Sequence, residues 1–439
     1  MINEMIEKWY RTNEDEVVSL ADKIWAKPEA SLEEFQACAN VADFLEKQGF
    51  RVQTFHCCDE NQQPNTVVAE WGNGTPVIGI LGEYDALLGL GQDATPYHSP
   101  KSGYGHGCGH NLMCPACASA ASAAKEAMET EKRSGTIRFI ACPAEEVGVG
   151  KLDLMKKGVF DGLECCMAWH PAGYDLTPFE GVLQALTVLK FDFFGEPAHA
   201  ALSPELGRSA LDAAELLNIG VQFLREHVTS DVRIHYVFLN GGDRPNIVPA
   251  YASLQYYVRA KDELSCKGVV ERVRRIAEGA AIMTDTKMSM ETQIESSETC
   301  IIHSFNRFLF ETAKKVPLIE YTREEKEFAA VLYRNILGKE PEEEILPGGL
   351  KEPTGHDIPA MGSTDVGRVT KMIPTARLFG LGILKDIPTH HWGVTASVGM
   401  SIGHKAALFA GQALAQAAYE ISCRPDQIAV WRKELESKK

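Results

Sequence analysis

The chain has 439 residues, a net charge of −16, and 45% apolar against 24% charged residues, the composition of an ordinary globular protein. This length predicts two or three domains, and the acidic charge argues against nucleic acid or an anionic membrane as a partner, because both repel such a surface. The N-terminus lacks a signal-peptide pattern and no apolar run approaches the roughly 20 residues of a membrane-spanning helix, so we expect a soluble, cytoplasmic protein.

Strands and helices alternate through the first part of the chain. Apolar residues recur at helical spacing before residue 50, and short runs rich in β-branched residues follow. The predicted helices lie before residue 50, at 116–128 and at 150–157, and the predicted strands lie at 66–70, 76–82, 136–142 and 165–169. This alternation predicts an α/β fold with a mainly parallel sheet covered by helices on both faces.

The pattern changes near residue 184. The predicted strands now lie at 184–194, 233–239, 252–259 and 287–296, and the predicted helices at 209–227 and 266–283. Their order is β-α-β-β-α-β, the split unit of ferredoxin-like domains. We expect this domain, at 184–298, to be inserted into a larger domain built from residues 1–183 and 299–439. Within the last part, residues 340–360 predict a mobile loop.

The Gly-rich run at 105–111 is the first of four clusters of chemistry-bearing residues that fall at strand ends or in loops, where open α/β sheets bind their ligands. Its glycines permit the irregular backbone that turns Cys108 and His110 toward one ion. Thiolate and imidazole are good zinc ligands, and imidazole also suits manganese or cobalt. Taken alone, the run is as well explained by a surface histidine loop.

An acidic pair follows the strand at 136–142. One carboxylate of Glu145 and Glu146 can hold a metal ion while the other accepts a proton from an activated water. The simpler explanation of such a pair is an acidic helix start, favoured by the helix dipole.

Histidines make the last two clusters. His170 follows the strand at 165–169, and His390 and His391 lie in a loop before the C-terminal helix. A lone histidine at a strand end is more often a loop residue than a ligand, and only one of two adjacent histidines can reach a given ion. Taken together, the clusters offer five ligands, more than the four of a closed zinc site, and therefore predict two metal ions.

These motifs, in this order, resemble the aminoacylase/carboxypeptidase family of dinuclear metallopeptidases. The resemblance covers nearly the whole chain and favours the amidohydrolase branch, which includes hydrolases of hippurate, indole-acetyl-amino acids and p-aminobenzoyl-glutamate. The matching runs are Gly-Glu-Tyr-Asp-Ala-Leu (82–87), Gly-His-Gly-Cys-Gly-His-Asn (105–111), Pro-Ala-Glu-Glu (143–146), Trp-His-Pro (169–171), Ala-His-Ala (198–200), Asn-Ile-Val-Pro (246–249) and Thr-His-His-Trp (389–392).

The resemblance implies a role for each matching residue. Glu145 would be the general base, and Asp85 would orient a metal ligand, although a strand-end turn explains Asp85 nearly as well. Relatives usually carry a single histidine before the tryptophan, so we choose His390 as the ligand and keep His391 as the fallback. The metal ligands would be Cys108, His110, Glu146, His170 and His390, and the ions manganese or zinc, with cobalt as a further candidate.

The inserted domain also gains implied roles. His199 would reach the active site of a partner subunit and stabilise the oxyanion, while Asn246 and Arg259 would hold the substrate carboxylate. Outside the inserted domain, Gly382 would line the same substrate pocket with its backbone N–H. The simpler explanations are a surface histidine, an arginine that braces the sheet, and a turn glycine like Gly380. These roles imply a dimerisation domain and a homodimer, with a separate second subunit as an open question.

We therefore expect a metal-dependent amidohydrolase that cleaves an N-acyl amino acid or a dipeptide-like substrate, p-aminobenzoyl-glutamate included, with metal-activated water and a Glu general base. The nearest alternative is a dipeptidase or carboxypeptidase of the same family. From other classes, Cys114-Pro-Ala-Cys117 raises a thiol redox enzyme, and a non-catalytic binding protein also fits. Twelve cysteines without a secretion signal predict thiols and not disulfides.

Overall fold

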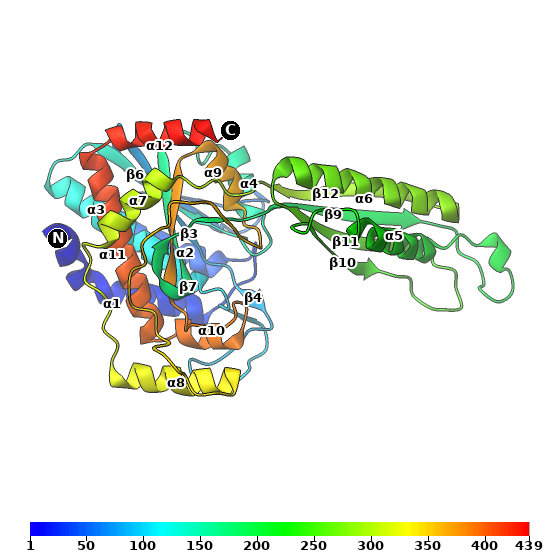
Figure 1. Cartoon of the computed structure of the whole chain (residues 1–439), viewed down its shortest axis with the longest axis horizontal. Helices are drawn as coiled ribbons and strands as arrows, with labels where there is room; N and C mark the ends of the chain where they lie inside the picture. The colour runs from blue at the N-terminus through cyan, green and yellow to red at the C-terminus, as the bar shows by residue number, and fades with distance from the viewer. Residues whose placement is uncertain (439) are drawn as a thin grey trace. The chain divides into compact units, whose positions relative to one another are not determined.

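A computed structural model describes residues 1–438 of the chain, which divide into two compact units (Figure 1). Unit 1 consists of Met1–Gly181, Cys300–Ile358 and the segment from Val369 onward, and unit 2 consists of Val182–Thr299 and Pro359–Arg368. The short segment Pro359–Arg368 is the part of unit 2 that the sequence does not predict. Within residues 1–438, no helix has the length and apolarity needed to cross a membrane.

Unit 1 is built on a six-stranded sheet with four parallel strands at one side. Its spatial order is β1 (Arg51–Phe55), β2 (Thr66–Asn73), β6 (Gly135–Cys142), β3 (Val77–Glu83), β7 (Cys165–Pro178) and β14 (Thr375–Gly382). The pairs of β3 with β6, β3 with β7 and β7 with β14 are parallel, whereas β1 and β2 attach in antiparallel fashion. The carboxyl ends of the parallel strands therefore meet at one edge, as the sequence predicts.

Helices cover the sheet of unit 1. The described helices are α1 (Glu4–Ala26), α2 (Phe35–Lys47), α3 (His110–Thr130), α4 (Gly150–Lys156), α7 (His303–Ala313), α8 (Arg323–Leu337), α10 (Trp392–Val398), α11 (Ser401–Cys423) and α12 (Asp426–Ser437). The Ala-rich α3 is buried along most of its length because small side chains let it pack closely. At Gly411 of α11, an added Cβ would lie 3.0 Å from the carbonyl oxygen of Ala116.

Four two-residue strands and the helix α9 lie outside the two main sheets. They are β4 (Leu87–Leu88), β5 (Tyr104–Gly105), β8 (Gly181–Val182), β13 (Ile358–Pro359) and α9 (Val366–Met372). The strands β4 and β5 pair with one another in antiparallel fashion. They therefore close the loop that precedes the Gly-rich run at 105–111.

One strand is longer than the sequence predicts. The prediction that a strand ends at Trp169 is wrong, because β7 continues to Pro178 and contains His170. His170 pairs in register with Phe379 of β14. Its side chain is therefore oriented by a strand with a neighbour, and not by a loop.

Unit 2 is a four-stranded antiparallel sheet with two helices. Its elements in chain order are β9 (Ala185–Phe194), the short 3₁₀ helix η1 (Pro204–Leu206), α5 (Ala210–Arg225), β10 (Arg233–Asn240), β11 (Tyr251–Ala260), α6 (Glu263–Thr284) and β12 (Lys287–Ser296). The spatial order of the strands is β10-β11-β9-β12. Both helices pack on the sheet and on one another around a core that includes Phe191, Leu217 and Val273.

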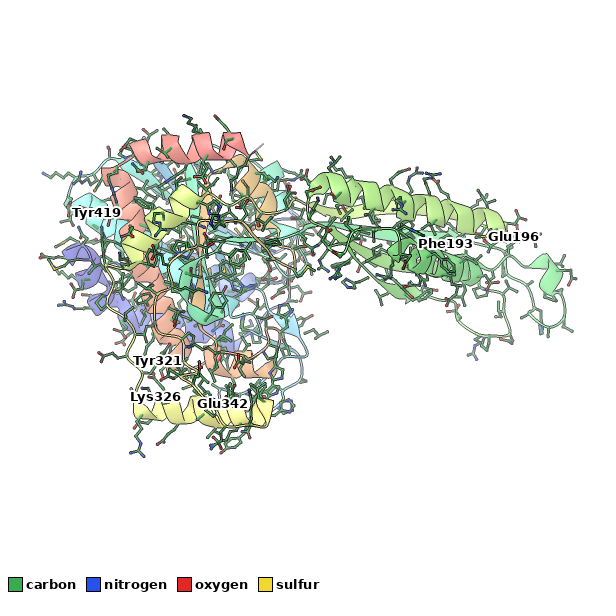
Figure 2. All side chains as sticks on the ribbon, viewed as in Figure 1. Phe193, Glu196, Tyr321, Lys326, Glu342 and Tyr419 are labelled. Carbon is green, nitrogen blue, oxygen red and sulfur yellow. The ribbon has the colours of Figure 1, made fainter. Side chains whose placement is uncertain are left out.

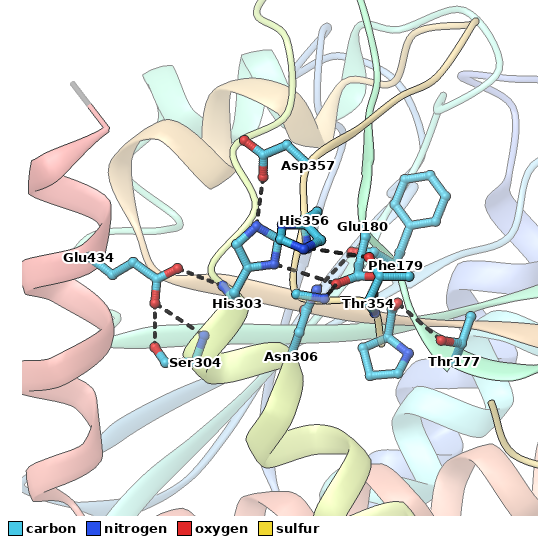
Figure 3. Close-up of polar contacts among 12 residues, drawn as sticks. Thr177, Phe179, Glu180, His303, Ser304, Asn306, Thr354, His356, Asp357 and Glu434 are labelled. Atoms are coloured by element: carbon cyan, nitrogen blue, oxygen red, sulfur yellow. Dashed lines mark hydrogen bonds and ion pairs between the residues drawn. The ribbon is translucent and has the colours of Figure 1, made fainter. Parts of the chain in front are cut away.

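Buried polar contacts anchor much of the segment 340–360, which the sequence predicts as a mobile loop. The carboxylate of Glu180 is buried and accepts hydrogen bonds from the backbone N–H and the hydroxyl of Thr354, at 2.6 and 2.8 Å (Figure 3). Tyr321, labelled in Figure 2, donates its hydroxyl to the carbonyl oxygen of Pro347 at 2.8 Å. The loop is thus tied to the body of unit 1 at several points.

Candidate metal centre

Two groups of possible metal ligands meet at the carboxyl edge of the unit 1 sheet. Cys108, His110 and His170 form one group, and Cys108, Glu146 and His390 form the other; in each, the ligand atoms lie within 4.8 Å of one another. These are the five ligands that the sequence predicts, and Cys108 belongs to both groups. A residue shared by two neighbouring groups suits a two-metal site, whose ions lie only about 4 Å apart.

Close backbone packing brings Cys108 to its partners. Gly109 adopts the left-handed conformation, with φ of 81°, and directly precedes His110, the first residue of α3. An added Cβ at Gly109 would lie only 2.6 Å from Cγ of Pro171, so a glycine is required at this point. The close approach leaves Sγ of Cys108 3.4 Å from Nε2 of His170.

Asp85 connects the two groups. Its buried carboxylate accepts a hydrogen bond from Nδ1 of His110 at 3.0 Å, and its second oxygen accepts one from the backbone N–H of Glu146 at 2.9 Å. The hydroxyl of Ser31 donates to the same oxygen at 2.8 Å. Asp85 therefore lies where the sequence predicts an orienting residue.

The residues present fit a metal ion. Because Asp85 takes Nδ1 of His110, its Nε2 faces the centre, where it is buried and makes no hydrogen bond within the described chain. The Oε1 atom of Glu146 is buried without a hydrogen bond as well. Such atoms cost about 1–3 kcal/mol each when they stay unsatisfied. Divalent cations held by thiolate, imidazole and carboxylate would satisfy both atoms.

The hydrogen bond of His170 leaves one of its two ring nitrogens available to bind a metal ion. Its Nδ1 donates to the carbonyl oxygen of Pro171 at 2.8 Å, so Nε2 is the atom that faces Cys108. Its ring stacks on Phe379, with centroids 5.0 Å apart. Burial, followed by the nearby His110, lowers the pKa of His170 to about 4, and the neutral imidazole is the form that binds metals.

The loop after β14 brings His390, and not the fallback His391, to the centre. His390 has a positive φ of 58°, and its backbone N–H donates to the carbonyl oxygen of Gly107 at 2.9 Å. Its Nε2 lies 3.5 Å from Oε2 of Glu146. His391 instead caps α10, where its Nδ1 accepts the backbone N–H of Gly393 at 3.2 Å.

Burial opposes the charged form of the thiol. It raises the pKa of Cys108 to about 12, although His110 acts in the opposite direction. Burial alone would also raise the pKa of Asp85, but the hydrogen bond from His110 and its other donors bring that pKa below its usual value. Since a metal ion binds the thiolate, binding must release the proton of Cys108.

Three buried residues near the centre have no role in the sequence analysis. Glu83, at the end of β3, forms a third group with His110 and Glu145 whose ligand atoms lie within 4.8 Å of one another. Lys151 of α4 lies against Glu83. Glu34 accepts the backbone N–H of Ala144 at 2.6 Å, next to Glu145. Only Glu83 had a signal in the sequence, as part of the run at 82–87.

His199 and Asn246 are both exposed and belong to neighbouring segments of unit 2. The backbone N–H of Ala200 donates to the carbonyl oxygen of Asn246 at 3.0 Å. Nδ1 of His199 accepts the backbone N–H groups of Ala201 and Leu202, both at 3.2 Å. In a neutral His199 the proton therefore sits on Nε2, which can donate a hydrogen bond. The predicted roles of both residues remain predictions.

Arg259 and Gly382 also keep their predicted roles only as predictions. Nε of Arg259 donates to the hydroxyl of Ser363 at 3.2 Å, within unit 2. Gly382 is buried at the end of β14, where an added Cβ would lie 3.5 Å from atoms of Leu112 and Pro171. Its φ of 79° favours glycine, which agrees with the turn explanation.

The Cys114-Pro-Ala-Cys117 motif lies inside α3. Both thiols are buried, and burial raises the pKa of Cys114 well above its usual range and that of Cys117 to about 12. A reactive redox thiol needs exposure and a lowered pKa. The environment of this motif therefore argues against the thiol redox alternative.

A model of the peptidase family M20/M25/M40 matches residues 79–401, which include every residue of the candidate metal centre. The chain belongs to this family. The family consists of peptidases, and similar proteins are named as a hydrolase and a dipeptidase. This chain is accordingly a hydrolytic enzyme that acts on amides.

Two relatives cover most of the chain. One of the subunits of the p-aminobenzoyl-glutamate hydrolase of Escherichia coli K12 is 34% identical over an alignment of 426 positions, which covers 90% of this chain and 87% of that protein. The Xaa-Arg dipeptidase of Mus musculus is 27% identical over an alignment of 436 positions, which covers 96% of this chain and 89% of that protein. Both similarities extend through the two units.

Solved structures share the fold. An aminobenzoyl-glutamate utilization protein from Klebsiella pneumoniae superposes with a TM-score of 0.65 at 19% identity, covering 94% of this chain and 98% of that chain. A dinuclear metal-binding peptidase of family M20 from Bacillus subtilis gives a TM-score of 0.63 at 19% identity, covering 94% and 99%. At this identity the likeness establishes the α/β fold with its central sheet.

Proposed function

We propose that the chain is a metal-dependent amidohydrolase that cleaves the amide bond of an N-acyl amino acid or of a dipeptide-like substrate. The observation that carries this proposal is the pair of ligand groups that share Cys108 beside a further carboxylate, Glu145. The relatives named for p-aminobenzoyl-glutamate and for Xaa-Arg dipeptides support an acylated amino acid as the substrate class.

The chain's own residues divide the work around the bond to be cut. Two divalent ions, when bound, would polarise the substrate carbonyl and make water a better nucleophile. Glu145 accepts a proton from the attacking water and returns it to the leaving amine nitrogen. The backbone contact between Glu34 and Ala144 fixes the start of the segment that carries Glu145.

The donor set indicates which metals to test. One thiolate, three imidazoles and one carboxylate suit zinc, and the imidazoles and carboxylate also suit manganese and cobalt. We propose two ions per chain, drawn from these three metals.

We propose that unit 2 is a ferredoxin-like dimerisation domain. Its β-α-β-β-α-β element order and its β10-β11-β9-β12 sheet order support this assignment. At the sheet edge, β10 exposes Val237 and Leu239, and on α5, Ile219 and Phe223 are exposed one turn apart. An apolar edge and helix face of this kind favour a homodimer.

Within such a dimer, His199 completes the partner's active site. Its Nε2–H donates to the oxyanion that forms on the carbonyl oxygen. Asn246 and Arg259 of unit 2 hold the carboxylate of the amino acid, for which the guanidinium of Arg259 is suited by its charge and its planar donors.

The test is a hydrolysis screen with manganese, zinc and cobalt over N-acyl amino acids, p-aminobenzoyl-glutamate and dipeptides. We expect Glu145→Gln to lose activity by at least about a hundredfold, the contribution of a general base, while it still binds two metal ions. Glu129→Gln, at the exposed end of α3, is the matched control. The proposal is wrong if the wild type cleaves no substrate with any metal, or if Glu145→Gln stays fully active.

The dipeptide substrates of this screen distinguish the two hypotheses within the family, an amidohydrolase and a dipeptidase. Faster cleavage of dipeptides than of N-acyl amino acids would make the chain a dipeptidase, as the Xaa-Arg dipeptidase relative suggests. Faster cleavage of acylated amino acids supports the amidohydrolase assignment.

A further inference from the structure

Lys151 is a charged side chain buried beside the metal centre. It is the second residue of α4 and follows Glu146 by five positions. Its side chain is 1% exposed, and lysines are almost never this buried unless an opposite charge pairs with them. The ammonium of Lys151 lies 2.5 Å from Oε1 of Glu83.

Glu83 stands between this ammonium and the centre. While Oε1 meets Lys151, Oε2 lies 3.5 Å from Nε2 of His110, the buried nitrogen that makes no hydrogen bond. Burial alone would raise the pKa of Glu83, but Lys151 and the neighbouring imidazoles bring it below its usual value. Glu83 therefore presents a carboxylate to both the lysine and the site proposed for the metals.

Two explanations fit a carboxylate in this place. Glu83 could be a further metal ligand, because it forms a ligand-like group with His110 and Glu145. Alternatively, the ammonium of Lys151 is the cation that pairs with Glu83, and Glu83 does not ligate a metal ion. The group Cys57, Cys58 and Asp153 offers a parallel, because Lys157 lies 3.1 Å from Asp153 there. In both groups, a lysine ammonium lies at ion-pair distance from a carboxylate.

We propose that Lys151 is a positioning residue whose fixed positive charge holds Glu83 as its counter-ion, so that Glu83 adds negative charge on the His110 side of the centre without ligating a metal ion. This inference deepens the proposed function, since it concerns the same site. The 2.5 Å contact favours it, because a carboxylate that binds an ammonium directly has less charge to offer a second cation.

The experiment compares the Co²⁺ affinity of the wild type, of Glu83→Gln and of a double variant by calorimetry and by the visible absorption of bound Co²⁺. Glu83→Gln removes the carboxylate that screens the ammonium from the metals, and we expect Co²⁺ to bind at least about tenfold more weakly. The double variant Glu83→Gln/Lys151→Met removes both charges. We expect its affinity to return to within about threefold of the wild type, because the repulsive charge is gone.

The double variant decides between the two explanations. If it binds Co²⁺ as weakly as Glu83→Gln, then Glu83 acts as a ligand and the proposal is overturned. A Glu83→Gln variant that binds Co²⁺ like the wild type would overturn it too. Lys315→Met is the matched control, because it removes the ammonium that pairs with another buried carboxylate, Glu420, elsewhere in unit 1. We expect it to lower stability and to leave Co²⁺ affinity unchanged.

Each variant's circular dichroism and melting temperature show whether it folds. If Glu83→Gln fails to fold, the double variant alone still tests the proposal. A Co²⁺ affinity of the double variant equal to that of the wild type supports the counter-ion role, and a strongly weakened affinity contradicts it. The readout needs no catalysis. If the wild type binds Co²⁺ but cleaves no amide, the proposed function is wrong, and the conclusion about Lys151 is unaffected.

Discussion

Oδ1 of Asp85 accepts a 3.0 Å hydrogen bond from Nδ1 of His110. The same carboxylate accepts the backbone N–H of Glu146 at 2.9 Å, so it holds one proposed ligand of each group. We expect Asp85→Asn to weaken metal binding about 10- to 100-fold, the usual effect of losing an orienting carboxylate. Competition titration with Mn²⁺ measures this, with the exposed Asp43→Asn as control. Equal affinities would contradict the orienting role.

Cys108 belongs to both ligand groups, so its loss should affect both ions. We expect Cys108→Ser to retain fewer than one metal ion per chain after dialysis, against two for the wild type, because a neutral hydroxyl is a poor replacement for a thiolate. Cys117→Ser is the control, since Cys117 is a buried thiol of α3 outside both groups. Metal content is measured by mass spectrometry. A Cys108→Ser protein that keeps both ions would exclude a shared thiolate ligand.

Glu34 should make stability depend on pH. Burial, reinforced by the charge of Asp85, raises its pKa from 4.5 to about 8. Between about pH 5 and pH 8 the folded chain keeps a proton that the unfolded chain releases, so the free energy of unfolding falls as the pH rises. Glu34→Gln cannot titrate, and we expect its stability relative to the wild type to increase across this range. Urea denaturation of the metal-free proteins at several pH values measures the difference; a pH-independent difference would refute it.

Mixed dimers test whether His199 serves the partner subunit. Glu145→Gln and His199→Ala should each be nearly inactive alone. After dissociation and reassociation at equal amounts, we expect about a quarter of the wild-type activity, because half of the dimers then contain one site with both native residues. Refolding each variant alone is the control. If mixing restores nothing although mixed dimers form, His199 acts within its own subunit.

The sequence predicts the fold well where local pattern and packing agree. The β-branched run at 76–82 becomes β3, and the order of the elements that form unit 2 agrees with the helical and strand periodicities. Features that depend on distant contacts escaped prediction. The strand β7 extends past Trp169 because β14 pairs with it, and Pro359–Arg368 joins unit 2 through tertiary packing.

The candidate site likewise contains residues that the sequence predicts and residues that it does not. Cys108, His110, Glu146, His170 and His390 could be predicted because they stand in compact motifs rich in metal-binding residue types. Lys151 and Glu34 could not, because nothing in a sequence distinguishes a buried lysine or glutamate from the many exposed ones. Their importance comes from burial and from contacts with residues more than 60 positions away.

The number and position of bound ions test the central claim most directly. Crystals grown with Mn²⁺ and measured at the manganese absorption edge locate each ion by its anomalous scattering. We predict two peaks about 4 Å apart, with Sγ of Cys108 between them, His110 and His170 on one ion, and Glu146 and His390 on the other. A single peak, or peaks away from Cys108, would contradict the account.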